Sequence, residues 1–242
     1  MGYPASSSPF SAVYGSGPSA SRAGVPKSFS GCSAALLTAP DGVTKLCAIA
    51  AGYFGAPENS SAALQPLKDF GTPALDALGP LPYTALNGLL DAGYPKGARN
   101  YWKSHFLETL ADDAVDVLLH AFDRCASPMS NIILEHFHGA ATRVPIDGTA
   151  YALRSAGYNL LFLSQWQDAA DDESGIAWAR EGYAGVQPLV STQRYLNYMD
   201  HDDEAAATLA AVYGPNLPRL REVKRRYDPD NVFHINVNIP PA

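Results

Sequence analysis

Tyrosine and asparagine side chains gather in two short segments near the end of the 242-residue chain. The first segment is Tyr195-Leu196-Asn197-Tyr198 and the second is Asn236-Val237-Asn238-Ile239-Pro240. An asparagine amide offers a donor and an acceptor at fixed geometry, and a tyrosine offers a flat apolar face with a polar tip. Such segments could line a flat heterocycle, hydrogen-bonding its edge and stacking on its face. They could equally be loops that end a sheet.

A second group with possible chemistry is the pair His136 and His138, which strand alternation would place on one face. Two imidazoles could bind a metal ion with a third ligand, but the sequence indicates no third ligand. Aspartates within residues 104–123 fall mostly outside the apolar stripe of that segment, as on a solvated helix surface. We therefore expect no metal site. The sequence also contains no glycine-rich dinucleotide loop, Walker loop, H-E-x-x-H motif or nucleophile elbow.

The elements that must position these residues alternate between strands and helices. Apolar runs predict strands at residues 44–53, 131–137 and 159–166. Apolar residues at helical spacing predict a helix starting at Asn59 or Ser60, and helices at 104–123 and 174–187. Strands interleaved with helices favour an α+β fold, in which an antiparallel sheet is covered by helices on one face.

Composition limits the class of protein. Hydrophobic residues make up 47% of the chain and charged residues 17%, which is typical of a globular protein. A formal net charge of -7 argues against binding to nucleic acid or to an anionic membrane surface. No apolar run reaches the roughly 20 residues of a membrane span, and no secretory signal is visible, so cytoplasmic localisation is the default expectation.

The first 30 residues differ from the rest, because they are rich in Ser, Ala, Gly and Pro and lack periodic apolar residues. We expect residues 1–38 to be disordered or loosely packed. The three cysteines are odd in number and lack metal-type spacing, which favours buried or idle thiols.

The order and spacing of residues from Tyr195 onward resemble the C-terminal end of the berberine-bridge-enzyme-like FAD-linked oxidases. The pattern reads Y-x-N-Y, then Y-G-x-N-x-x-R-L-x-x-x-K-x-x-Y-D-P-x-N-x-F, then N-x-N-I-P, ending at Pro240. The likeness continues upstream through Tyr101-Trp102-Lys103-Ser104, Leu134-Glu135-His136, Gly139-Ala140 and Arg143-Val144. It covers roughly residues 40–242.

This resemblance implies a substrate-binding α+β domain at 39–194 and a C-terminal segment at 195–242 that returns toward the flavin site. In the family a further N-terminal domain grips most of the FAD, and nothing in residues 1–40 resembles it. We therefore expect the chain alone not to retain FAD. The implied partners are a small alcohol or sugar-like substrate and either a separate flavin-binding chain or a second copy of this chain.

The resemblance also implies roles for individual residues. Tyr195 would act as the base on a substrate hydroxyl while hydride passes to the flavin, and Tyr198 would share the site. The amides of Asn197, Asn236 and Asn238 would approach the flavin. Plant-type members carry a glutamate base where Leu161 stands here, so that variant is not supported.

The strand at 131–137 would line the substrate cavity, so Glu135 or His136 would point into it. The pleat forbids both from doing so. With His138 beside it, His136 is the preferred candidate, while Glu135 would be buried or paired.

The sequence leaves two other interpretations open, and in both of them the chain is not an enzyme. The cavity could bind a small molecule without redox chemistry, or the chain could be a non-functional truncated remnant.

Overall fold

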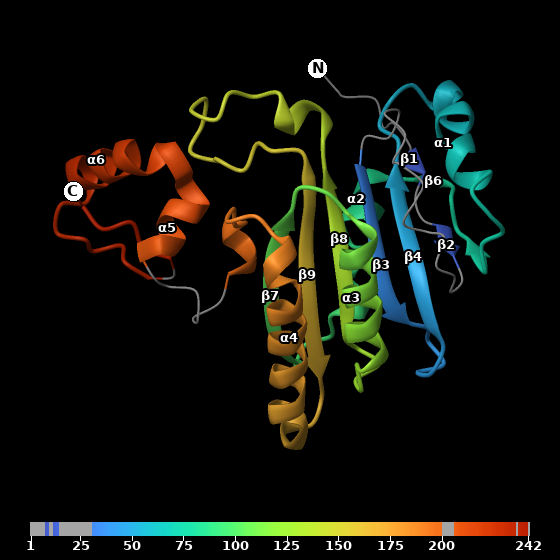
Figure 1. The fold of residues 1–242 in the computed structure, drawn as a ribbon. Coiled ribbons are helices and arrows are strands. Elements are labelled where there is room, and N and C mark those ends of the chain that lie inside the picture. The colour runs from blue at the N-terminus through green and yellow to red at the C-terminus, as the bar shows by residue number, and fades with distance from the viewer. Residues whose placement is uncertain (1–7, 10–11, 15–30, 200–205, 236, 242) are drawn as a thin grey trace.

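A seven-stranded antiparallel sheet forms the centre of the computed structural model (Figure 1). The structure describes residues 8–9, 12–14, 31–199, 206–235 and 237–241. The strand order is β5-β2-β4-β3-β8-β9-β7. The five longer strands are β3 (Gly31–Thr38), β4 (Lys45–Gly52), β7 (Arg99–Leu107), β8 (Asn131–Phe137) and β9 (Gly157–Trp166). The predicted α+β class and antiparallel sheet are thereby confirmed.

Short strands complete one edge of the sheet. Strands β2 (Ala12–Tyr14) and β5 (Leu75–Asp76) extend it beyond β4. Strands β1 (Ser8–Pro9) and β6 (Pro80–Leu81) pair separately as a two-stranded sheet. The other edge is β7, whose only partner among the described strands is β9.

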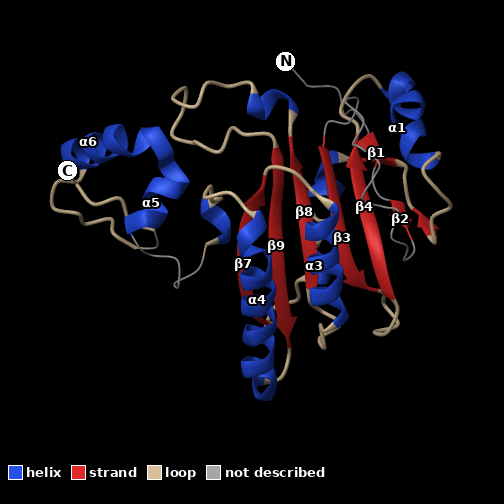
Figure 2. Cartoon of the chain, in the orientation of Figure 1, coloured by secondary structure: helices blue, strands red, loops and turns tan. Residues whose placement is uncertain are grey.

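Helices α1 (Ser60–Lys68), α3 (Asp112–Asp123) and α4 (Asp172–Val186) pack against one face of the sheet, the helical face (Figure 2). Residues paired across an antiparallel ladder share a face, so the pairs Ile132–Phe162 and Leu134–Leu160 both point to these helices. The core there also contains Leu107, Leu118, Ala121, Phe122, Trp178, Ala179 and Val186.

Close packing of α4 on β9 depends on a glycine. A Cβ atom at Gly182 would overlap the ring of Phe162, so only glycine lets the helix lie this near the strand. Trp178 crosses from α4 to α3, where its Nε1 donates to the Ala121 carbonyl at 2.8 Å. The two helices and the sheet thus form a single hydrophobic core.

The C-terminal part lies beyond the β7 edge of the sheet, at the left of Figure 1. It contains α5 (Ala206–Tyr213) and α6 (Leu217–Tyr227). Asn216, which is buried between them, donates its amide to the carbonyls of Ile146 at 2.8 Å and Thr149 at 3.1 Å. This anchors the C-terminal helices to the loop before β9. No helix in the described part of the chain has the length and apolar character to cross a bilayer.

The helix predicted across 104–123 is wrong at its start. Residues up to Leu107 belong to strand β7, and the helix begins only at Asp112. The apolar residues Leu107 and Leu110 imitate helical spacing, but Lys103 to Leu107 are buried on both faces of the sheet. A strand enclosed on both sides loses the alternation that would reveal it.

The expected loose packing of residues 1–38 is also corrected in part. Gly31–Thr38 forms β3, which lies in the middle of the sheet and pairs with β4 and β8. Ala12–Tyr14 forms β2, which pairs with β4 on one side and β5 on the other. Small residues such as Ala34 and Ala35 carry little hydrophobic signal individually, yet they suit a strand with neighbours on both sides.

Candidate functional site

The face of the sheet opposite the helical face carries a cluster of aromatic side chains; we call it the tyrosine face. Tyr195 and Tyr198 meet edge to face with ring centroids 5.0 Å apart. Tyr198 lies 6.5 Å from Trp102, and Tyr195 lies 6.2 Å from Phe137 and 6.1 Å from Tyr151. The two predicted tyrosines therefore belong to one continuous aromatic surface.

Hydrogen bonds along the outer edge of β7 hold residues 191–198, the tyrosine segment, in place. The Ser191 amide donates to the Phe106 carbonyl at 2.8 Å, and the Arg194 guanidinium donates to the Ser104 carbonyl at 2.9 Å. The Ser104 hydroxyl then donates to the Tyr198 carbonyl at 3.2 Å. The segment satisfies polar groups that an edge strand would otherwise leave unpaired.

Arg194 is fixed in turn on the helical side of β7. Its guanidinium contacts Nδ1 of His105 and lies 5.3 Å from the Tyr183 ring centroid. The His105 ring stacks on Tyr183 at 3.8 Å, and its Nε2 lies 3.3 Å from the Tyr183 carbonyl oxygen. Burial and the Arg194 charge lower the pKa of His105 to about 3, so the imidazole is neutral and accepts from the arginine.

Glu135 is the acidic residue of the tyrosine face. Its side chain points there because Glu135 pairs with Asn159 across the β8–β9 ladder, in the register that faces away from the helices. The Asn159 amide donates to Oε2 at 2.8 Å, and the Tyr198 hydroxyl donates to Oε1 at 3.0 Å. Both carboxylate oxygens therefore have donors.

The environment of Tyr198 keeps its phenol protonated. Burial raises the pKa of Tyr198 well above its ordinary value, and the negative charge of Glu135 and the hydrogen bond to it raise the pKa further. Tyr198 is thus a neutral donor to a carboxylate. The Tyr195 oxygen accepts a hydrogen bond of 2.9 Å from the exposed amide of Asn197.

The two predicted substrate-binding residues, Glu135 and His136, lie on opposite faces of the sheet, and His136 does not lie with the tyrosines. It points to the helical face, where its ring stacks on His138 at 4.4 Å and on Tyr158 at 4.9 Å. Burial and the neighbouring His138 lower its pKa. The pleat does separate the two neighbours, as expected, but it is Glu135 that faces the tyrosines.

The remaining predicted residues lie as follows. Asn197 is exposed beside Tyr195, and Asn238 is half-buried. Asn236 lies outside the described residues. Leu161 is buried on the tyrosine face, and the three cysteines are free and half-buried. Among the described residues, no three His, Cys, Asp or Glu side chains are grouped so as to hold a metal ion.

A small cavity adjoins Tyr195. Its volume is about 200 Å³, and it lies between the loop 150–153, the segment 194–196 and Val212 and Tyr213 of α5. The lining is chiefly apolar or phenolic. A group the size of a small side chain would fit beside the Tyr195 ring.

Sequence reasoning missed several residues that complete the site. Asn159 fixes Glu135, and His105 fixes Arg194. Trp102, Ser104 and Phe106 point to one face of β7 and Lys103 and His105 to the other, but this strand is buried on both faces and shows no polar–apolar alternation in the sequence. The helix prediction over this stretch concealed the strand.

Comparisons with known proteins all point to the same kind of protein. The family model described as berberine and berberine-like matches residues 194–240. An FAD-linked oxidoreductase of Dictyostelium discoideum is 27% identical over 212 residues, covering 86% of this chain and 45% of the relative. A tetrahydroberberine oxidase of Berberis wilsoniae is 26% identical over 175 residues, covering 65% of this chain and 33% of that enzyme.

Among solved structures, a berberine-bridge-enzyme-like protein of Arabidopsis thaliana superposes with a TM-score of 0.83 at 17% identity. That match covers 100% of this chain and 58% of the other. At this identity the likeness concerns the fold. The chain spans about half the length of the relatives that it matches.

Proposed function

The chain belongs to the berberine-bridge-enzyme-like FAD-linked oxidoreductases, and on this premise we propose that its tyrosine face forms one wall of a site for alcohol oxidation. The observation that carries the proposal is the Tyr198–Glu135 hydrogen bond of 3.0 Å beside Tyr195. A phenol joined to a carboxylate can accept one proton and release another, as removal of a hydroxyl proton requires.

The proton takes a two-residue route. The Tyr198 oxygen receives the proton of the substrate hydroxyl while its own proton passes to Oε1 of Glu135. A concerted transfer avoids a free phenolate, whose formation is disfavoured by the raised pKa of Tyr198. Asn159 holds the carboxylate in position through Oε2. Tyr195 is the alternative acceptor, because its ring packs against Tyr198 and the Asn197 amide holds its oxygen in place.

The residues of the tyrosine face fit the edge of a flavin ring. Tyr195 and Tyr198 present aromatic surface, and the amide of Asn197 is exposed at the rim of the cluster. Asn197 and Asn238 would hold the polar edge of the ring, as the resemblance implies. FAD, when bound, accepts the hydride that leaves the alcohol carbon.

The substrate lies against Tyr195. The cavity of about 200 Å³ there is bordered by Tyr151, Leu153 and Val212, among others. An alcohol with a small apolar substituent would fill it, whereas a fully hydroxylated sugar would leave hydroxyl groups without partners at the apolar wall. We therefore favour an alcohol with an apolar side over a sugar.

The isolated chain is proposed to bind FAD weakly, with most FAD contacts supplied by another segment or chain. Phe233 and Ile235 are 79% and 80% exposed and offer apolar surface for such a partner. Gel filtration of the chain mixed with FAD should separate the flavin from the protein, and the protein should elute larger than a monomer unless a flavin-domain chain is present. A yellow, monomeric peak would contradict this proposal.

The function is tested by Tyr198→Phe in a flavin-loaded assembly of this chain. Loss of the proton acceptor should slow flavin reduction by an alcohol roughly 10²–10⁴-fold. Tyr158→Phe is the matched control, because it removes a phenol from the helical face and should leave the rate unchanged. If Tyr198→Phe reduces flavin at the parent rate and Tyr195→Phe does not, Tyr195 is the acceptor. Parent rates in both variants would overturn the proposal.

A further inference from the structure

A larger cavity, of about 440 Å³, lies at the far end of β9 from the tyrosine cluster. It is enclosed by the loop after α3 (residues 124–130), the end of β9 and the first turns of α4. Trp166, which lines it, is seven residues along β9 from Asn159 of the Glu135 site. At strand spacing this separates the two sites by roughly 23 Å. The volume falls within the range of small-molecule sites.

The inner wall of this cavity is apolar and makes few demands for hydrogen bonds. It includes Cys125, Pro128, Met129, Trp166 and Trp178. Both indole N–H groups are already used, by the Asp172 carboxylate at 2.8 Å and the Ala121 carbonyl at 2.8 Å. The neighbouring serine hydroxyls are also paired, since those of Ser127 and Ser130 donate to the Gln165 carbonyl and that of Ser164 donates to the Gly175 carbonyl. The wall therefore suits an apolar or aromatic body.

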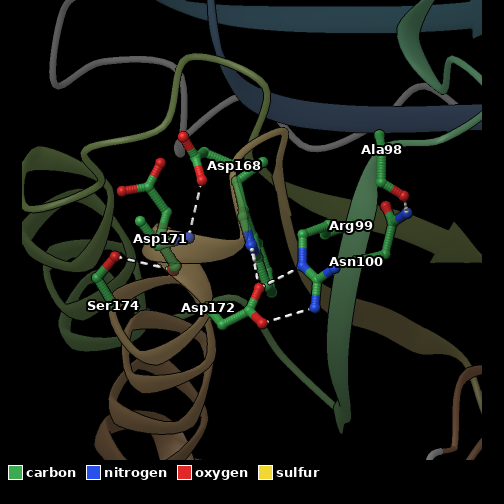
Figure 3. Close-up of polar contacts among 9 residues, drawn as sticks. Ala98, Arg99, Asn100, Asp168, Asp171, Asp172 and Ser174 are labelled. Carbon is green, nitrogen blue, oxygen red and sulfur yellow. Dashed lines mark hydrogen bonds and ion pairs between the residues drawn. The ribbon is translucent and has the colours of Figure 1, made fainter.

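The rim of the cavity is acidic. Asp168 and Asp171 line it, and Figure 3 shows their carboxylates on the same side of the start of α4. Asp168 Oδ1 accepts from the Ala170 amide at 2.9 Å, and no ion pair of either carboxylate is found among the described residues. Asp172 is different, because Arg99 and Trp166 both bind it (Figure 3). Arg124 is the single cationic residue of the lining.

We propose that this cavity is a second ligand site, which takes a small organic cation with an aromatic or apolar body and an ammonium group. The body lies against Met129 and the two indoles, and the ammonium group lies between Asp168 and Asp171. This site is independent of the proposed oxidation at the tyrosine face.

The charges of the rim favour a cation over an anion. A helix N-terminus normally attracts anions, but the first turn of α4 already holds Asp172 and Glu173. Asp172 is paired with Arg99, but the carboxylates of Asp168, Asp171 and Glu173 still outnumber the remaining guanidinium, that of Arg124. Indole rings also attract cations through their π faces, which adds to the same preference.

The test titrates the full chain with phenethylamine and, separately, with 3-phenylpropionate, which has a similar body and the opposite charge. The chain contains three tryptophans, and two of them line the cavity, so tryptophan fluorescence reports binding there. Trp102→Phe, which removes the tryptophan of the tyrosine face, should keep the signal. Phenethylamine should bind at least about tenfold more tightly than phenylpropionate, the discrimination that about 1.4 kcal/mol provides.

Variants that remove the negative charges of Asp168 and Asp171 decide whether the rim causes the preference for a cation. The double variant Asp168→Asn, Asp171→Asn should weaken phenethylamine binding at least about tenfold, and asparagine preserves the cap that Asp168 supplies. The control is Asp113→Asn with Asp116→Asn, which removes two exposed carboxylates from the first turns of α3 and should leave binding unchanged. Equal affinity for the anion, unchanged affinity in the Asp168/Asp171 variant, or no saturable signal would each overturn the proposal.

Discussion

The two faces of the sheet use the same strands for different purposes. On the helical face, Phe162 and Leu160 of β9 pack into a core closed by α3 and α4. On the tyrosine face, Asn159 of the same strand donates to the Glu135 carboxylate, which also accepts a hydrogen bond from the Tyr198 hydroxyl. Adjacent residues on one strand thus serve the hydrophobic core and the proposed site separately. A sheet covered by helices on one side leaves its other side available for a site without loss of the core.

Polar groups are treated differently on the two faces as well. The helical face buries His105 as a neutral ring that accepts from Arg194, with the Lys103 charge also nearby. The tyrosine face keeps the carboxylate of Glu135 supplied with two donors. On the helical face the protonated form of His105 is disfavoured, whereas on the tyrosine face the Glu135 carboxylate accepts hydrogen bonds from the Tyr198 hydroxyl and the Asn159 amide.

Among changes that separate the two faces, the largest effect is expected from His105→Gln. The quantity to measure is the free energy of unfolding as a function of pH. The pKa of His105 is about 3 in the folded chain and about 6.5 when unfolded. Below pH 6.5 the unfolded chain therefore binds a proton that the folded chain does not, so stability falls as the pH falls toward 3. This contributes a slope of about 1.4 kcal/mol per pH unit.

Glutamine removes that slope and keeps an oxygen that can accept from Arg194. Urea unfolding between pH 7 and pH 4 should therefore show a flatter dependence for His105→Gln than for the parent chain. The exposed His120 on α3 supplies the control, His120→Gln, whose profile should follow the parent. Parallel profiles for His105→Gln and the parent chain would contradict a neutral buried imidazole.

A smaller effect is expected from Gly182→Ala on the helical face. The added Cβ would overlap the Phe162 ring inside the core, and overpacking of this kind costs roughly 1–3 kcal/mol of unfolding free energy. Gly185→Ala is the matched change one turn later on the same helix. Gly185 is exposed, and its Cβ would meet Val117 at an ordinary 3.4 Å, so helix propensity should stabilise the chain by up to about 1 kcal/mol. The same sign for both substitutions in thermal unfolding would refute this packing.

The sequence predicted the elements that show regular apolar patterns. The strand at 131–137 coincides with β8, and the strand at 159–166 and helix at 174–187 differ from β9 and α4 by two residues at most. Failure came where the pattern was ambiguous. Lys103 to Leu107 form a strand buried on both faces, and β3 is built largely from small residues.

The candidate site was predictable only up to the choice of face. The tyrosine segment was identified from its residue types and order. The pleat also required Glu135 and His136 to point in opposite directions. Which of them meets Tyr198 depends on the register with β9 and on which side the helices pack, and neither follows from local pattern. Asn159 and His105 act through partners far apart in sequence, so no spacing could have identified them.

The most direct test compares two neighbouring residues that the sheet separates. In a flavin-loaded assembly of this chain, Glu135→Gln and His136→Gln each replace one side chain with a neutral amide on opposite faces of β8. If the tyrosine face carries the chemistry, Glu135→Gln should slow flavin reduction by an alcohol roughly 10²–10⁴-fold, while His136→Gln should leave the rate within about twofold of the parent. A slow His136→Gln variant beside a fast Glu135→Gln variant would contradict the account.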